Sequence, residues 1–244
     1  MNIRFFKSTL PVSFLILLFT ITVNGQDNAD MGYNNYHSTF QLWPSIKLNK
    51  DFKYGWNANV QYVMRADLMN RAIDGHYFYA SVKYKAFKFL QPDFQFRGVI
   101  TPEKNLYRFE FGVKARYKYK NWVFAYRMAY FHENEYFART YEHGHFPTNY
   151  WRNRIEVRWD FKKQWGAYVT AEAYTLFDYR GMNVRRVAFI GGLEYAFKKM
   201  HSINLVYMAQ PDFSSKYPDL VQAIAVVYAW DIPDSFKKKK KKSR

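Results

Sequence analysis

The chain has 244 residues, of which 49% are hydrophobic and 21% aromatic, and its formal net charge is +17. It contains no cysteine, which excludes a disulfide framework and a lipid-attachment cysteine. After residue 25 no stretch approaches the roughly 18 consecutive apolar residues of a transmembrane helix, so a helical membrane protein is also excluded.

The first 25 residues have the pattern of a secretory signal peptide. Arg4 and Lys7 precede an apolar run from Val12 to Val23, which is shorter than the roughly 20 residues that a helix needs to cross a bilayer. The run ends at Val23-Asn24-Gly25, where small or medium-sized side chains occupy the positions that a signal peptidase reads, so we expect cleavage before Gln26. The sequence therefore predicts a signal peptide at 1–25, one barrel domain at 26–230 and a basic disordered C-terminal tail at 231–244.

Hydrophobic and polar residues alternate along most of the remaining chain. In residues 107–119, for example, aromatic and apolar side chains alternate with Arg108, Glu110, Lys114 and Arg116. A period of two indicates a strand, because a helix would scatter both sets around its axis. The predicted strands are 39–48, 52–65, 75–86, 93–101, 107–119, 122–132, 150–161, 165–177, 185–197, 200–210 and 219–230.

The length of these segments indicates a membrane barrel. Strands of soluble proteins average about 5–6 residues, whereas a tilted membrane-crossing strand needs about 9–11, and most of these segments have ten or more. An arginine facing lipid near the membrane centre costs about 2–4 kcal/mol, so the face that carries Arg152, Arg154 and Arg158 must line the lumen. The predicted fold is all-β, a transmembrane up-and-down antiparallel β-barrel of a Gram-negative outer membrane. An exported soluble β-sandwich is the alternative.

Strand number and orientation follow from the connections. Single-chain bacterial barrels normally have an even number of strands, so residues 27–38 would add a weak edge strand and give about 12. Ten strands would result if the region 75–101 is misread. Short connections, flanked by aromatic residues, are expected in the periplasm at 49–51, 120–121, 162–164 and 198–199. Longer ones are expected outside at 66–74, 133–149, 178–184 and 211–218.

Several loose motifs resemble a bacterial family known as domain of unknown function 2490. They are W-P-S-I-K-L-N-K-D-F-K-Y-G-W at 43–56, Q-Y at 61–62 with Arg65, R-N-R-I-E-V at 152–157 and E-A-Y at 172–174. The resemblance covers roughly residues 38–230. It implies an outer-membrane-type barrel and supplies no catalytic or binding residues.

The inward face of the predicted strands is rich in charge, and it is the candidate functional site. Its predicted members are Arg65, Lys83, Arg97, Arg108, Glu110, Lys114, Arg116, Arg127, Arg152, Arg154, Glu156, Arg158, Asp160, Glu172, Arg186 and Glu194. Rings of arginine and lysine favour anionic solutes, which suggests a narrow anion-preferring channel. The alternative is an internal salt-bridge network that fills the lumen.

Other functions have weaker support in the sequence. The segment 132–149 carries three histidines and could act as a ligand-binding extracellular loop, but no pair has a diagnostic metal-ligand spacing. A lipid-modifying enzyme at the barrel rim would need a nucleophile and a base, and only His201 and Ser202 are adjacent. We therefore predict no enzyme, no cofactor and no metal site. The expected partners are outer-membrane lipids, the barrel assembly machinery and small anionic solutes, not nucleic acid.

Overall fold

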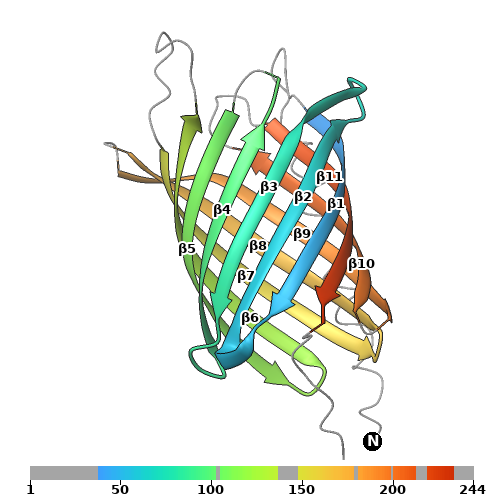
Figure 1. Cartoon of the computed structure of the whole chain (residues 1–244). Coiled ribbons are helices and arrows are strands. Elements are labelled where there is room, and N and C mark those ends of the chain that lie inside the picture. The colour runs from blue at the N-terminus through green and yellow to red at the C-terminus, as the bar shows by residue number, and fades with distance from the viewer. Residues whose placement is uncertain are drawn as a thin grey trace, which may run out of the picture. The chain divides into compact units, whose positions relative to one another are not determined.

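A computed structural model of the chain describes residues 38–102, 105–136, 148–178, 181–198, 200–212 and 219–233. Within these residues eleven strands form one closed barrel, in which each strand pairs with its neighbours in sequence and the first pairs with the last (Figure 1). The strands are β1 (Ser38–Asp51), β2 (Trp56–Asp67), β3 (Ala72–Tyr84), β4 (Leu90–Ile100), β5 (Asn105–Tyr119), β6 (Trp122–Tyr136), β7 (Thr148–Lys162), β8 (Trp165–Asp178), β9 (Gly181–Lys198), β10 (His201–Asp212) and β11 (Asp219–Ile232). The all-β barrel predicted from the alternation is confirmed.

The barrel closes through a parallel pair. Residues Ser38–Lys50 of β1 lie beside Leu220–Ile232 of β11 in parallel register, whereas every other neighbouring pair is antiparallel. This follows from the odd strand number, because the first and last strands of an eleven-strand meander run in the same direction. The described strands are thus one fewer than the expected twelve. Of the proposed extra strand, residues 27–37 lie outside the described part of the chain, and Ser38 begins β1.

The connections differ in part from those expected. The first turn lies at 52–55 rather than 49–51, because the 3-10 turn η2 (Lys53–Gly55) places Tyr54 and Gly55 at φ of 60° and 84°. Gly55 adopts this left-handed conformation without steric cost, and β2 begins at the next residue, Trp56. The connection expected at 178–184 has only two residues, 179–180, and that expected at 133–149 shortens to 137–147. β11 also extends to Ile232, two residues into the predicted tail.

Aromatic side chains form a continuous band beside the short connections. The band runs from β6 to β11 through stacked or tilted ring pairs, with each ring contacting the next across or along the strands. Its ring-centroid distances include 5.6 Å for Trp122–Trp159, 4.5 Å for Trp165–Tyr195, 5.8 Å for Phe197–His201 and 6.1 Å for His201–Trp230. Within the described residues, no helix is long and apolar enough to cross a membrane.

Candidate functional site

The two faces of the barrel wall have inverted polarity relative to a soluble protein. Glu110 is 1% exposed and Arg108 is 7% exposed, whereas Phe111 on the same strand is 61% exposed. The same alternation holds on β7, where Ile155 is 59% exposed between the ion-paired residues Arg154 and Glu156. The interior therefore contains charge, and the apolar groups face outward.

One ion-pair cluster lies in the half of the barrel near the longer connections, which are those at the same end as 137–147 and 213–218. Glu133 accepts hydrogen bonds from Arg97 and from Arg108, whose Nε and Nη2 lie 3.0 and 2.7 Å from the carboxylate. The guanidinium of Arg108 also lies 3.9 Å from the centre of the Phe131 ring, which is itself fully buried. Two guanidinium groups thus share one carboxylate, and that of Arg108 also lies on an aromatic face.

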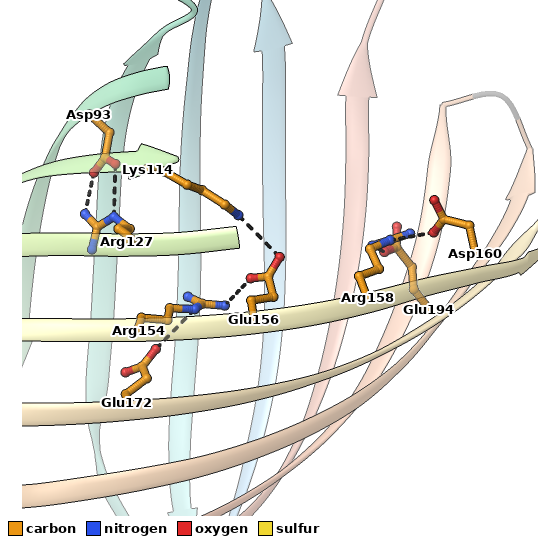
Figure 2. A network of polar contacts seen from close by, with 9 residues as sticks. All are labelled: Asp93, Lys114, Arg127, Arg154, Glu156, Arg158, Asp160, Glu172 and Glu194. Carbon is orange, nitrogen blue, oxygen red and sulfur yellow. Dashed lines mark hydrogen bonds and ion pairs between the residues drawn. The ribbon is translucent and has the colours of Figure 1, made fainter. Parts of the chain in front are cut away.

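A second cluster crosses the interior between strands that are not neighbours. Arg127 on β6 donates to Asp93 on β4 through Nε, at 3.0 Å, and through Nη2 (Figure 2). Its Nη1 lies 2.5 Å from Glu110 on β5, and Glu110 also accepts from Nη2 of Arg152 at 2.6 Å. Arg127 reaches Asp93 by passing over Gly112 of β5, where a Cβ would lie 2.6 Å from its Nη2. The glycine is required by this close approach.

A third cluster links β5, β7 and β8. Glu156 accepts from Nζ of Lys114 at 3.3 Å and from Nη2 of Arg154 at 2.9 Å (Figure 2). Nε of Arg154 lies 3.4 Å from Glu172, which also accepts from the Tyr174 hydroxyl at 2.7 Å. Glu156 therefore has two donors, whereas Glu172 has one hydrogen-bond donor and an ion pair with Arg154.

Two further groups of ion-paired residues occupy opposite ends of the lumen. Near the short connections, Arg158 donates through Nε to Asp160 at 2.7 Å and through Nη1 to Glu194 at 2.5 Å (Figure 2). These three residues border a cavity of about 440 Å³ at the barrel rim. Near the longer connections, Nη2 of Arg186 lies 2.7 Å from Asp212.

Four cations of the inward face lack an ion pair with any described residue. Arg65 is sandwiched between aromatic rings, with its guanidinium 3.9 Å from the centre of Trp43 and 3.8 Å from that of Tyr77. The other three, Lys47, Lys83 and Arg116, border a cavity of about 470 Å³. Its further lining residues are Asn59, Gln61, Tyr79, Ser81, Gln91, Asp93, Gln95, Lys114, Ala125, Arg127, Arg152, Arg154 and Glu156.

The structure brings most of the predicted inward residues into these clusters and adds four that sequence reasoning missed. The additions are Lys47, Asp93, Glu133 and Asp212. Lys47 and Asp93 both follow the alternation of their strands, so the sequence held a signal for them. Glu133 lies outside the predicted strand 122–132, because β6 continues four residues beyond that strand. The additional carboxylates mean that the lumen is less basic than the predicted residues alone imply.

The alternative sites do not assemble in the described residues. His132 bonds Asn149 through Nδ1 at 2.9 Å, while its neighbour Glu133 belongs to the inward cluster with Arg97 and Arg108. No group of three histidine, aspartate or glutamate side chains in the described part of the chain could hold a metal ion. Residues 137–147 lie outside the described part. His201 contacts the Tyr228 hydroxyl at 2.8 Å, so its Nδ1 is engaged across the strand pair rather than with Ser202.

Comparison with known proteins adds little. No protein-family model and no curated protein sequence matches the chain, so the resemblance to domain of unknown function 2490 stays a prediction. One similar solved structure is described as a "Bacterial polysaccharide outer membrane secretin", with a TM-score of 0.46, 10% identity, and coverage of 73% of this chain and 63% of that chain. The chain thus spans less than two thirds of that structure's length, and at this level the likeness carries no functional argument.

Proposed function

We propose that this chain is an outer-membrane β-barrel, exported with a signal peptide that is removed before Gln26. Two features of the wall support this proposal. Every strand has at least the roughly 9–11 residues that a tilted membrane crossing requires. The outward face is apolar, and exposing a large apolar side chain such as Phe111 to water instead of lipid would cost about 1.5–3 kcal/mol.

The aromatic band supports the same orientation. Tryptophan and tyrosine rings favour the membrane interface because they combine an apolar body with a polar group. The band beside the short connections would then lie at the periplasmic interface, since bacterial barrels place their tight turns in the periplasm.

We further propose that the lumen is a narrow conduit that prefers anions. The observation that carries this proposal is the set of three cations, Lys47, Lys83 and Arg116, that form no ion pair with any described residue and lie beside an open cavity. The ion-paired residues contribute little net charge, because over all the clusters their eight cations are matched by eight carboxylates. The unpaired ones act across a low-dielectric wall, which strengthens their attraction for anions.

Reversal potentials in a salt gradient test this function. The refolded chain in a planar bilayer should give a small conductance with chloride preferred over potassium, and this preference should weaken at high salt as screening increases. The double substitution Lys83→Gln and Arg116→Gln should reduce the preference. Lys53→Gln, which removes the same charge from the exposed turn η2, should leave it unchanged. Cation selectivity would contradict the proposal.

A closed barrel is the second candidate. The ion-pair clusters fill the half of the lumen near the longer connections, where Glu110, Phe131 and Val99 are at most 3% exposed. If the folded chain gives no conductance, this filling would explain it, and the barrel would act as a structural or ligand-binding protein through its outer connections.

A further inference from the structure

The three cations without an ion pair among the described residues occupy one region of the lumen. Lys47, Lys83 and Arg116 belong to β1, β3 and β5, and each lies in the half of its strand that ends at a short connection. Lys83 and Arg116 are exposed and Lys47 is half-buried, although all three line the inside of the barrel. Water therefore reaches them within the lumen.

The cavity has a large excess of positive charge. Its lining includes seven lysine and arginine side chains but only two carboxylates, Asp93 and Glu156. Both carboxylates already have partners, because Asp93 accepts two bonds from Arg127 and Glu156 accepts from Lys114 and Arg154. Arg152 pairs with Glu110, which lies outside the lining. Neither lining carboxylate is therefore free to neutralise Lys47, Lys83 and Arg116.

Neutral hydrogen-bonding groups fill the wall between the cations. Asn59 donates to Ser81 at 2.7 Å, and Gln61 donates to Ser45 at 3.1 Å. The amide of Gln95 also borders the cavity. Such a wall offers donors for an oxyanion, and Ala125 and the ring of Tyr79 are the few apolar groups in the lining, so the cavity favours a polar ligand.

The cavity is more accessible from one side than from the other. Toward the longer connections packed side chains narrow the interior, since Glu110 and Phe131 are almost completely buried. Around its circumference the closed barrel separates it from the surrounding phase, so the headgroup of a lipid cannot enter through the wall. A ligand would therefore enter from the aqueous phase at the end with the short connections.

We propose that this cavity binds a small multivalent oxyanion of the phosphate type, free in the aqueous phase. The volume of about 470 Å³ lies within the range of about 300–1,000 Å³ of small-molecule sites and limits the ligand to a small one. Several cations around one space favour an ion with more than one negative charge, because each charged group forms its own charge-assisted hydrogen bond. The inference rests on the inward orientation used in the proposed function, but it does not require that ions pass through.

Calorimetric titration of inorganic pyrophosphate into the folded full chain in detergent tests the site. Binding should occur in chloride buffer, which shows preference over a monovalent anion, and it should weaken with added salt. Lys83→Gln and Arg116→Gln should each weaken binding about tenfold, the effect of losing one charge-assisted hydrogen bond. Lys53→Gln should bind as the unchanged chain does.

The design separates this site from other sources of binding. The six lysines at 237–242 also attract anions, but they are unchanged in every variant, so only the difference between variants reports on the cavity. Folding of each variant is checked by its migration in SDS before heating. Equal affinity of the unchanged chain and the folded double variant, or no binding by the unchanged chain, would overturn the proposal. Pyrophosphate binding without conductance would contradict the proposed channel and support the oxyanion site. Chloride-selective conductance without pyrophosphate binding would support the channel and contradict the oxyanion site.

Discussion

The contact between Gly112 and Arg127 makes a sharp test of the lumen structure. A Cβ at position 112 would lie 2.6 Å from Nη2, 2.9 Å from Cζ and 3.0 Å from Nε of Arg127. All three distances are below ordinary van der Waals contact, so Gly112→Ala must displace the guanidinium. Because Nε and Nη2 are the atoms that donate to Asp93, the displacement weakens this pair first.

The magnitude follows from what Arg127 loses. Removing one partner from a buried ion pair costs about 3–5 kcal/mol, which is an upper limit here because the alanine moves the arginine without deleting it. One charged hydrogen bond is worth about 1.5–3 kcal/mol, and we expect Gly112→Ala to lower the free energy of unfolding by this amount. The side chain of Asp93 is only 6% exposed, so water cannot fully replace the lost bond.

Urea unfolding of the barrel in detergent or lipid, followed by tryptophan fluorescence, measures this loss. Gly191→Ala is the matched control, because a Cβ at that glycine meets no atom within 4 Å. In an Arg127→Ala background, Gly112→Ala should become nearly neutral, since the atoms it displaces are gone. If Gly112→Ala and Gly191→Ala were equally stable, or if the cost persisted without Arg127, the placement of Arg127 over β5 would be wrong.

Two further predictions concern the faces and closure of the wall. Val157→Arg should lower the stability of the inserted barrel by about 2–4 kcal/mol if position 157 lies near the membrane midplane, and it should impair insertion into vesicles. The Arg158→Val barrel should still assemble. The opposite result would show that the inward and outward faces are assigned the wrong way round. A closed barrel with every strand paired should also resist SDS until it is heated, so unheated and boiled samples should migrate differently on a gel. Identical migration together with a helical circular dichroism spectrum would contradict the fold.

The strands were predictable because their signal is local. Alternation of large apolar and charged residues predicted the segments 107–119 and 150–161, which are contained within β5 and β7 almost to their ends. A one-residue slip of register would place Arg152, Arg154 and Arg158 in lipid, so the same pattern also predicted which face turns inward.

The ion-pair partners and the strand number were not predictable from local pattern. Arg127 and Asp93 lie on β6 and β4, and their contact depends on how tilted strands are staggered around the whole barrel. The polar residues at 132–135 interrupt the apolar face and so predict a loop at Glu133, yet β6 continues through them. The strand number was set at about twelve by a rule about even numbers, whereas the closure in this chain depends on pairing between residues far apart in sequence.

The parallel closure of the barrel can be tested with engineered cysteines, because the chain contains none of its own. Ser45 of β1 lies beside Val227 of β11 in the parallel pair, and beside Val63 of β2 in the antiparallel pair on its other side. Neighbouring strands are about 4.8 Å apart, within the reach of a disulfide, whereas an inserted twelfth strand would double that separation and prevent the bond. We therefore expect the folded Ser45→Cys/Val227→Cys protein to cross-link on oxidation as readily as Ser45→Cys/Val63→Cys. Pairing Ser45→Cys with Ala223→Cys, four residues out of register, should give no bond. A barrel that cross-links 45 to 63 but never 45 to 227 would have another segment between β1 and β11, and eleven strands would be the wrong number.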